Sequence, residues 1–345
     1  MNPLVSILIP AYNAEPWIAD TVRSALAQTW ARKEIIIVDD GSSDGTPSIA
    51  RQFASKTVTV VTQANQGASA ARNNAFELCQ GDYIQWLDAD DLLSPNKIAK
   101  QIEIAETSAS RRTLLSSAWA YFLYRSSKAK FIPTPLWCDL SPIEWLLRKW
   151  EHNAHMQTAT WLVSRELTEA AGPFDTRLLG DDDGEYFSRV ILRSDGIRFV
   201  PDAKVYYRAA GSNRLSYIGP SDKKMEAQVF AMKIQIGYLR SLEDSERVRA
   251  ACLKYLQTWL GHFYPDRPDI VEQVQQLAAE LGGKLLIPPL RWKYTWIRPI
   301  LGYALAKRAQ LLFPKMRWSV ESTWDKALFA LENYKTSIDK ALANS

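Results

Sequence analysis

The sequence predicts an α/β fold with a mostly parallel central sheet, followed by an all-helical region. Apolar runs alternate with helical patterns through the first hundred residues or so, as in a parallel sheet with crossover helices. Unusual polar residues gather where the predicted strands end, which is where open α/β sheets bind ligands. After Gly219-Pro220 the pattern is helical and carries no strand signal.

The N-terminal part is expected to contain four strands and four helices. The strands are expected at 5–9, 34–38, 57–62 and 83–87, and the helices at 16–28, 47–54, 68–79 and 95–106. Two of these helices open with a good cap residue followed by proline, in Thr46-Pro47 and Ser94-Pro95.

The alternation weakens after residue 113. Strands are expected at 114–124, 158–163, 197–200 and 203–208, and helices after 141, at 165–171 and at 185–193. Ser141-Pro142-Ile143-Glu144 is a capping box, and Gly172-Pro173 ends a helix. We place a domain boundary near Gly219, which divides the chain into residues 1–219 and a helical C-terminal region, residues 220–345.

Composition narrows the class of protein. Hydrophobic residues at 47% and charged residues at 23% are ordinary values for a globular chain. The three cysteines and three histidines show no paired spacing, which argues against a disulfide framework or a zinc site and for a reducing compartment. The first residues lack the basic stretch of a signal peptide, and no run approaches the roughly 18 apolar residues that span a bilayer. We therefore expect a cytoplasmic protein.

The run Asp88-Ala89-Asp90-Asp91 follows the apolar strand predicted at 83–87. Carboxylates this close repel one another, and the arrangement is usually kept where a hard cation or a row of hydroxyls compensates the charge. Magnesium or manganese with a sugar nucleotide would do so. The alternative is an acidic turn that caps the next helix.

Three further motifs fall at strand-to-helix junctions, and the carboxyl ends of parallel strands meet at one edge of a sheet. The motifs that contain Asp39 and Gly67 are each, alone, also compatible with ordinary turn chemistry or, for Arg72, a surface ion pair. The three motifs are Pro10-Ala11-Tyr12-Asn13, Val38-Asp39-Asp40-Gly41-Ser42, and Gly67 through Arg72-Asn73.

Together with the acidic run, these motifs resemble, in order and spacing, the nucleotide-sugar half of inverting family 2 glycosyltransferases of the GT-A fold. The resemblance covers about residues 4–210. It implies a Rossmann-like nucleotide-diphospho-sugar transferase domain within residues 1–219. It also implies an enzyme of the hexosyltransferase type that uses a nucleotide-diphospho-sugar donor, with a UDP-sugar favoured.

The resemblance also implies roles for individual residues. Tyr12 and Asp39 match positions that hold the base, and Arg72 matches one near the base and diphosphate. Asp88 matches the carboxylate at the ribose or metal, and Asp90 matches the direct ligand of Mn²⁺ or Mg²⁺. The full donor-binding set is Pro10, Tyr12, Asn13, Asp39, Gly67, Arg72, Asp88 and Ala89.

An inverting transfer also needs a base to take the proton of the acceptor hydroxyl. The segment from Gly180 to Glu185 resembles the acidic pair that precedes an amphipathic helix in the family. We assign Asp183 as the base and Asp182 as the next choice, with Asp181 as a solvated cap. A helix cap is the alternative for the whole cluster.

One departure from the family pattern concerns the metal. In many relatives a tyrosine-arginine pair is followed two residues later by a metal-binding histidine, whereas Tyr207-Arg208 is followed by Ala209-Ala210. The cation would then rest on Asp90, the diphosphate and water, or on a loop residue such as Asn213.

The C-terminal region carries an uneven charge. Residues 281–320 contain eight basic residues and no acidic one, so the +4 of the whole chain leaves −4 for the remainder. Arginines and lysines alternate with tryptophans near Trp292 and Trp296, a pattern that favours an anionic membrane surface. Packing of these tryptophans on the core is the alternative. The acidic remainder excludes a nucleic-acid partner.

The sequence therefore predicts a glycosyltransferase that acts in cell-surface polysaccharide or glycolipid synthesis on a saccharide or lipid-linked acceptor. It would be cytoplasmic, or peripheral at the inner face of the membrane. Two alternatives stay open. One is transfer to polyprenyl phosphate, which needs no strong base, and the other is a sugar-nucleotide-binding protein without turnover, which the absent histidine favours.

Overall fold

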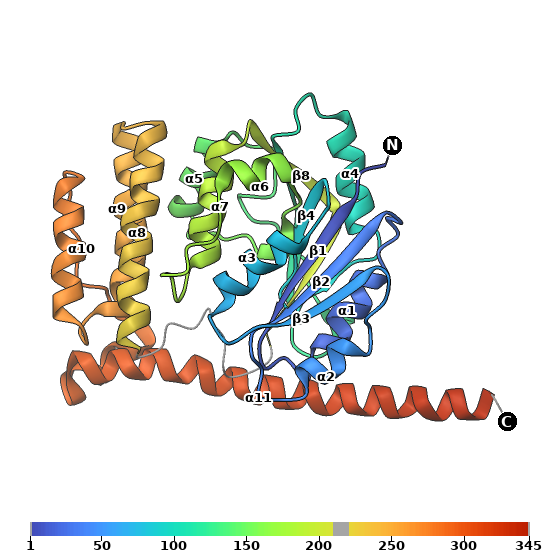
Figure 1. Cartoon of the computed structure of the whole chain (residues 1–345). Helices are drawn as coiled ribbons and strands as arrows, with labels where there is room; N and C mark the ends of the chain where they lie inside the picture. The colour runs from blue at the N-terminus through green and yellow to red at the C-terminus, as the bar shows by residue number, and fades with distance from the viewer. Residues whose placement is uncertain (1, 210–220, 344–345) are drawn as a thin grey trace.

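The computed structural model describes residues 2–209 and 221–343 of the chain. Its central sheet has the strand order β3-β2-β1-β4-β7, in which the first four strands are parallel and β7 is antiparallel (Figure 1). The strands are β1 (Val5–Ala11), β2 (Lys33–Asp39), β3 (Val58–Thr62), β4 (Tyr83–Trp86) and β7 (Val163–Ser164). The expectation of a mostly parallel sheet is confirmed.

Strands β1 and β2 consist largely of buried isoleucine, valine and leucine, as expected for parallel strands that are covered on both faces. Helix α3 packs on β1 and β2, and α1 and α4 lie toward a second sheet. The helices of this part are α1 (Ile18–Leu26), α2 (Thr46–Arg51), α3 (Ala68–Leu78) and α4 (Lys97–Thr107).

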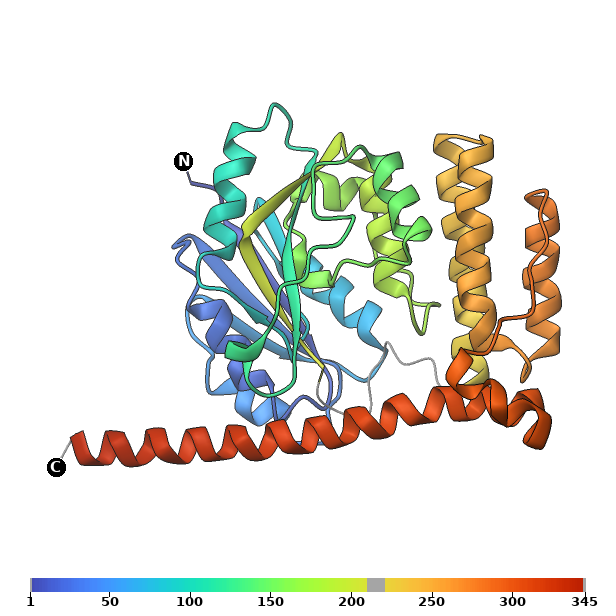
Figure 2. The ribbon, with the colours of Figure 1, turned by 180° about the vertical axis from the view of Figure 1, so that it is seen from behind.

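The second sheet has the order β5-β8-β6 and lies in front of the central sheet when the molecule is seen from behind (Figure 2). Its strands are β5 (Leu92–Leu93), β6 (Thr113–Phe122) and β8 (Gly196–Arg208). The two strands expected at 197–200 and 203–208 are a single strand. Its pairing with β6 jumps from Ser117↔Val200 to Ala118↔Lys204, so a bulge absorbs the residues between them.

Three further local expectations were wrong or only partly right. The strand expected at 158–163 is the 3-10 helix η2 (Thr158–Thr160) followed by the short β7, because the Gln157 side chain accepts from Ala159 N and caps a turn. Ser94 caps no helix, since α4 begins at Lys97 and Asn96 precedes it. Thr46 is the first residue of α2, and the Asp44 carboxylate accepts from its hydroxyl.

Three helices lie between the sheets and the C-terminal region. Ser141 accepts from Glu144 N at the start of α5, and Gly172 ends α6 with a positive φ of 77°, both as expected. The first turn of α7 holds acidic residues and begins at Asp182, earlier than expected. The helices are α5 (Pro142–Glu151), α6 (Arg165–Ala171) and α7 (Asp182–Arg193).

The described part of the C-terminal region contains helices and no strand, as expected, and residues 283–291 form an irregular connection. Helix α8 packs on α7, and α9 packs on α5, where the Trp150 and Tyr255 rings stack with centroids 4.7 Å apart. The elements are α8 (Asp222–Leu242), α9 (Glu246–Phe263), α10 (Pro268–Glu280), η3 (Trp292–Ile297) and α11 (Arg298–Ala343), the last broken at Gly302. The boundary expected near Gly219 lies outside the described residues.

Helix α11 runs along one side of the molecule and passes the edge of the sheets (Figures 1 and 2). Its Asp325 carboxylate accepts from the backbone N–H groups of Tyr124 and Arg125 and pairs with the Arg125 guanidinium at 2.7 Å. Within the described ranges, no helix is both long enough and apolar enough to cross a bilayer.

Candidate functional site

The loops that follow β1 and β2 are hydrogen-bonded to each other. Asn13, which has a left-handed φ of 47°, donates its backbone N–H to the Ser42 hydroxyl at 2.9 Å, and its side-chain oxygen accepts from Ser43 N. Pro10 lies inside β1, at a level where β1 no longer pairs with β4. The structure thus brings these two predicted motifs together at one edge of the sheet.

The two neighbouring aspartates after β2 differ in their surroundings. Asp40 accepts hydrogen bonds from Gln63 Nε2, Gln66 N and Gly67 N at 2.8–2.9 Å, and so holds the loop before α3. Asp39 is 1% exposed, and neither carboxylate oxygen has a hydrogen-bond partner within the described ranges. A buried carboxylate in this state is able to accept a hydrogen bond from a ligand or from water. Tyr12, 54% exposed, lies on the neighbouring loop.

Arg72 joins the two acidic clusters. From α3 its buried guanidinium reaches Asp182 Oδ2 at 2.6 Å and Asp88 Oδ1 at 2.9 Å, and it lies over the Phe174 ring. Burial lowers the pKa of Arg72, but the charges of Asp182, Asp88 and Asp183 more than offset this and raise it, so the side chain stays cationic. Arg72 is therefore a buried bridge and not a surface ion pair.

The carboxylates of the acidic run after β4 differ in their surroundings. Asp91 is fully buried, and its carboxylate accepts from Arg208 N at 2.8 Å and from Gln157 Nε2. Burial raises the pKa of Asp91 well above its usual range, and the charges of Asp90 and Asp88 add to the shift. The Ala89 carbonyl accepts from the Thr21 hydroxyl. The third carboxylate is therefore part of the fold.

A cation at this loop would find hard oxygen ligands in Asp88 and Asp90, which suit Mg²⁺ or Mn²⁺. Arg208 holds the same loop by donating Nε to the Asp90 carbonyl at 2.7 Å. Over residues 2–209 and 221–343, no group of three or more His, Cys, Asp or Glu side chains is assembled for a metal. Asn213, the other predicted ligand, lies outside those ranges. The residues present fit a cation that takes its remaining ligands from diphosphate and water.

The N-terminus of α7 presents the second acidic cluster. Asp182 is held by Arg72 and by the Ser69 hydroxyl at 3.1 Å. Asp183 Oδ2 accepts from the Thr158 hydroxyl at 3.0 Å, and its Oδ1 accepts from Gly184 N. Among the residues described, Asp183 has no ion pair within 4.0 Å, so it lacks the cationic partner that Asp182 has.

Asp181 was expected to be a solvated cap, and this expectation was wrong. It has a left-handed φ of 55°, and its Oδ2 accepts from Gln235 at 2.6 Å, Gln228 at 3.3 Å and Tyr255 at 3.4 Å. Burial raises the pKa of Asp181, and nearby Lys149 opposes the shift. The donors come from α8 and α9, so the helical region anchors the start of α7.

Three residues contact the acidic clusters in ways that the sequence did not predict. Gln157 donates to Asp91, Thr158 donates to Asp183, and Arg208 donates to the Asp90 carbonyl. Gln157 and Thr158 carry no local sequence pattern, because each acts through a carboxylate far away in the chain. Arg208 belongs to the tyrosine-arginine pair already noted in the sequence. Its guanidinium lies over the rings of Trp17 and Phe122 at 4.4 and 4.5 Å.

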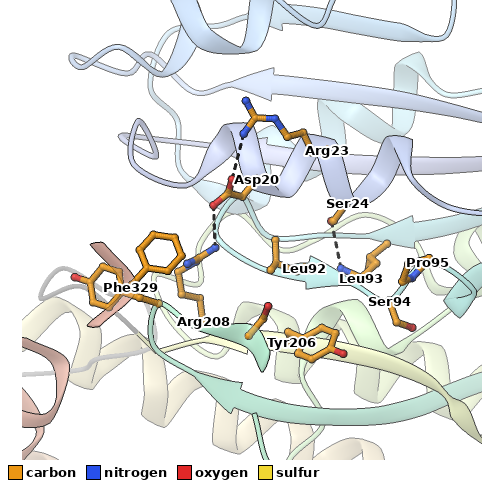
Figure 3. A pocket seen from close by; sticks show the side chains of 12 residues that line it. Asp20, Arg23, Ser24, Leu92, Leu93, Ser94, Pro95, Tyr206, Arg208 and Phe329 are labelled. Carbon is orange, nitrogen blue, oxygen red and sulfur yellow. Dashed lines mark hydrogen bonds and ion pairs between the residues drawn. The ribbon is translucent and has the colours of Figure 1, made fainter. Parts of the chain in front are cut away.

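A cavity of about 420 Å³ lies beside β5 and β8. Figure 3 shows Asp20 between Arg23 and Arg208, with Phe329 of α11 at the side of the cavity. None of the predicted donor or catalytic residues lines it. The cavity is therefore separate from the site at the strand ends, although Arg208 borders it and also contacts the acidic loop.

Comparison with known proteins finds a sequence family that the N-terminal part of the chain resembles. Residues 6–111 match glycosyl transferase family 2. TuaG of Bacillus subtilis, named as a candidate teichuronic acid biosynthesis glycosyltransferase, is 45% identical over 105 residues, which are 30% of this chain and 42% of TuaG. The uncharacterized glycosyltransferase EpsJ of the same organism is 29% identical over 216 residues, 60% of this chain and 62% of EpsJ. The chain covers less than two thirds of either relative.

Two solved structures share the fold. TarS from S. aureus in complex with UDP-GlcNAc gives a TM-score of 0.64 at 18% identity, over 88% of this chain and 87% of that chain. The mannosyltransferase PcManGT from Pyrobaculum calidifontis in complex with GDP-Man and Mn²⁺ gives 0.51 at 18% identity, over 91% and 88%. The predicted GT-A fold class is confirmed, and so is the resemblance to family 2.

Replacing Arg72 tests the bridge between the acidic clusters. We expect Arg72→Met to lower the free energy of unfolding by about 3 kcal/mol, because two carboxylates lose their buried counter-charge. Urea unfolding at neutral pH measures the loss. The matched control is Arg23→Met, whose exposed pair with Asp20 is expected to contribute less than about 1 kcal/mol. Equal effects of the two variants would contradict the assignment.

Proposed function

We propose that this chain, whose residues 6–111 carry a glycosyl transferase family 2 domain, is an inverting glycosyltransferase. It would move a sugar from a nucleotide-diphospho-sugar, with a UDP-sugar favoured, to an acceptor hydroxyl. The observation that carries the proposal is the Arg72 bridge, because it ties the loop of Asp88 to the helix that bears Asp182 and Asp183. Asp88, on the side of the donor, and Asp183, on the side of the acceptor, would thereby lie close enough to act on one bound sugar.

The donor nucleotide would lie at the ends of β1 and β2. The Asp39 carboxylate, which has no hydrogen-bond partner among the described residues, can accept from a base N–H, and the exposed Tyr12 ring can pack on the base. Arg72, although it already bridges two carboxylates, keeps a full positive charge near the expected diphosphate.

Asp88 and Asp90 would hold Mn²⁺ or Mg²⁺ together with the diphosphate. Such a cation neutralises the negative charge that develops on the leaving nucleotide. The contacts of Asp91 and Arg208 would keep the loop of Asp88 and Asp90 in place when donor binds and product leaves, because both side chains are buried and hydrogen-bonded within the fold.

Asp183 is our choice for the base, in preference to Asp182. In the transfer the acceptor oxygen bonds to the anomeric carbon, the bond from that carbon to the diphosphate oxygen breaks, and the acceptor proton passes to a carboxylate. Asp182 is committed to Arg72, whereas Asp183 is held by a hydroxyl and a backbone N–H that leave it able to accept a proton.

The acceptor is proposed to be a saccharide or lipid-linked saccharide of a surface polymer. The support is the teichuronic acid name of TuaG. The exposed apolar side chains of the C-terminal region, which favour binding to a membrane surface, add to it. On η3 and the start of α11, Trp292 is 85% exposed, Trp296 is 64% exposed and Ile300 is 69% exposed.

Three cations, Arg291, Lys293 and Arg298, are exposed on the same segment. Tyr294 and Ile297 point inward and pack on Leu290 and Ala306, so the buried and exposed side chains separate cleanly. Exposed tryptophans flanked by cations favour an anionic headgroup layer. We propose that this segment attaches the enzyme peripherally to a membrane. Lys307 is buried and does not belong to the surface.

A thermal-shift screen of nucleotide sugars tests the donor and the cation together. At about 100 times Kd, a UDP-sugar is expected to stabilise the protein by about 2.7 kcal/mol, because it binds only the folded state. Mn²⁺ should enlarge the shift in the wild type and not in Asp90→Asn. The control variant Asp244→Asn changes an exposed aspartate of the α8–α9 connection and should behave as wild type. No shift with any nucleotide sugar would contradict the proposal.

Asp183→Asn tests the base. We expect sugar transfer into the lipid and polysaccharide fractions of a cell extract to fall about 10²- to 10⁴-fold, while the donor-induced thermal shift is unchanged. Asp182→Asn should instead weaken donor binding, since it disturbs Arg72. Full transfer by Asp183→Asn would favour a polyprenyl phosphate acceptor, and donor binding without turnover in the wild type would favour a non-catalytic protein.

Flotation with vesicles tests the membrane segment. The wild type should float with phosphatidylglycerol vesicles and not with phosphatidylcholine alone, because each exposed cation contributes about 1 kcal/mol at an anionic surface. The double change Trp292→Ser with Trp296→Ser should abolish flotation. Ile132→Ser removes a side chain that is 70% exposed elsewhere, and it should not affect flotation. Equal flotation of all three proteins would refute the attachment site.

A further inference from the structure

An aromatic cluster that the proposed donor site does not use lies beside the acidic helix. It consists of Trp119 and Tyr121 on β6, Tyr207 on β8, and His155 in the segment before η2. The Trp119 ring centroid is 4.7 Å from that of His155 and 4.9 Å from that of Tyr121, and Tyr121 is 5.2 Å from Tyr207. The Tyr121 hydroxyl and His155 Nε2 are 3.4 Å apart.

Strand geometry explains why these rings share a face. Trp119 and Tyr121 are two residues apart on β6, and Tyr207 is the direct partner of Tyr121 in the parallel pairing. The next residues along, Phe122 and Arg208, also pair and point to the opposite face, where Arg208 holds the Asp90 carbonyl. The end of β8 thus has the loop that contains Asp90 on one face and the aromatic cluster on the other.

The cluster is open to solvent at its outer side. Trp119 is 7% exposed and forms the floor, whereas Tyr121 is 47% exposed and His155 is also exposed. The exposed rings of Tyr121 and His155 are therefore accessible to a ligand.

The cluster is contiguous with the proposed base. Thr158, three residues after His155, donates its hydroxyl to Asp183 at 3.0 Å. The charge of Asp183 also acts on His155, where it opposes the fall in pKa that desolvation produces. A ligand that lies over Tyr121 and His155 is therefore beside the carboxylate that would take the acceptor proton.

The chemistry of the cluster matches a sugar ring. A pyranose has a face of C–H groups, which suits the electron-rich face of an aromatic ring, and a rim of hydroxyls, which suits the Tyr121 hydroxyl and the imidazole. We propose that Trp119, Tyr121, His155 and Tyr207 bind a sugar ring of the acceptor and orient its hydroxyl toward Asp183. The placement beside a base rests on the proposed function, whereas the saccharide site itself does not.

A paired comparison of two exposed tyrosines tests this acceptor platform. The full-length protein is applied to an array of immobilised oligosaccharides, and UDP is titrated separately. Tyr121→Ala should weaken binding to the saccharides that the wild type recognises by about tenfold and leave UDP affinity unchanged. Tyr12→Ala, which removes a ring of similar exposure at the donor site, should do the reverse.

Tyr121→Phe keeps the ring and should keep most of the saccharide binding, and thermal melting confirms that each variant folds. The proposal is overturned if the wild type binds no saccharide on the array, or if Tyr121→Ala and Tyr207→Ala both bind saccharides as the wild type does. It is also overturned if Tyr121→Ala loses UDP instead. If UDP does not bind but Tyr121→Ala still loses saccharide binding, the platform stands and the proposed donor is refuted.

Discussion

The site depends on one buried cation between two carboxylates. Arg72 leaves the face of α3 and joins the loop after β4 to the start of α7, and among the described residues no backbone hydrogen bond connects these two elements. A guanidinium is suited to this place because its planar fork donates in two directions and it keeps its charge when buried. Its desolvation is costly, and the charges of Asp182, Asp88 and Asp183 offset that cost. The relative position of the two acidic clusters follows from this contact.

Each acidic run contains a member that the fold uses. Asp40 holds the loop before α3, Asp91 holds Arg208 and Gln157, and Asp182 holds Arg72. The fixed member positions its neighbour, since adjacent residues share a backbone. The result places Asp39, Asp90 and Asp183 at defined points without using the carboxylates of Asp39 or Asp183 in ion pairs among the described residues. Repeated acidic residues thus combine a structural role with a proposed chemical role.

Local patterns predicted most of the first sheet, because buried parallel strands and amphipathic helices have strong periodicities that need no tertiary information. They failed where a distant partner decides the conformation. Gln157 forms a turn and reaches Asp91, so the expected strand does not form there. Asp181 looked like a solvated cap because its donors lie on α8 and α9, and no spacing rule connects residues so far apart. The motif residues were found from their order, whereas their partners required the fold.

The C-terminal helices are part of the proposed active site and are more than an attachment device. Asp181 Oδ2 takes its donors from α8 and α9, and the buried Glu185, one turn further along α7, accepts from the Tyr238 hydroxyl of α8 at 2.8 Å. Without these donors a carboxylate at the first turn of α7 would be left desolvated and unpaired, which is costly. Because Asp183 lies two residues from Asp181 on the same turn, any shift of α8 is transmitted to the proposed base. Helices α8 and α9 therefore help to position the residues that would meet the acceptor.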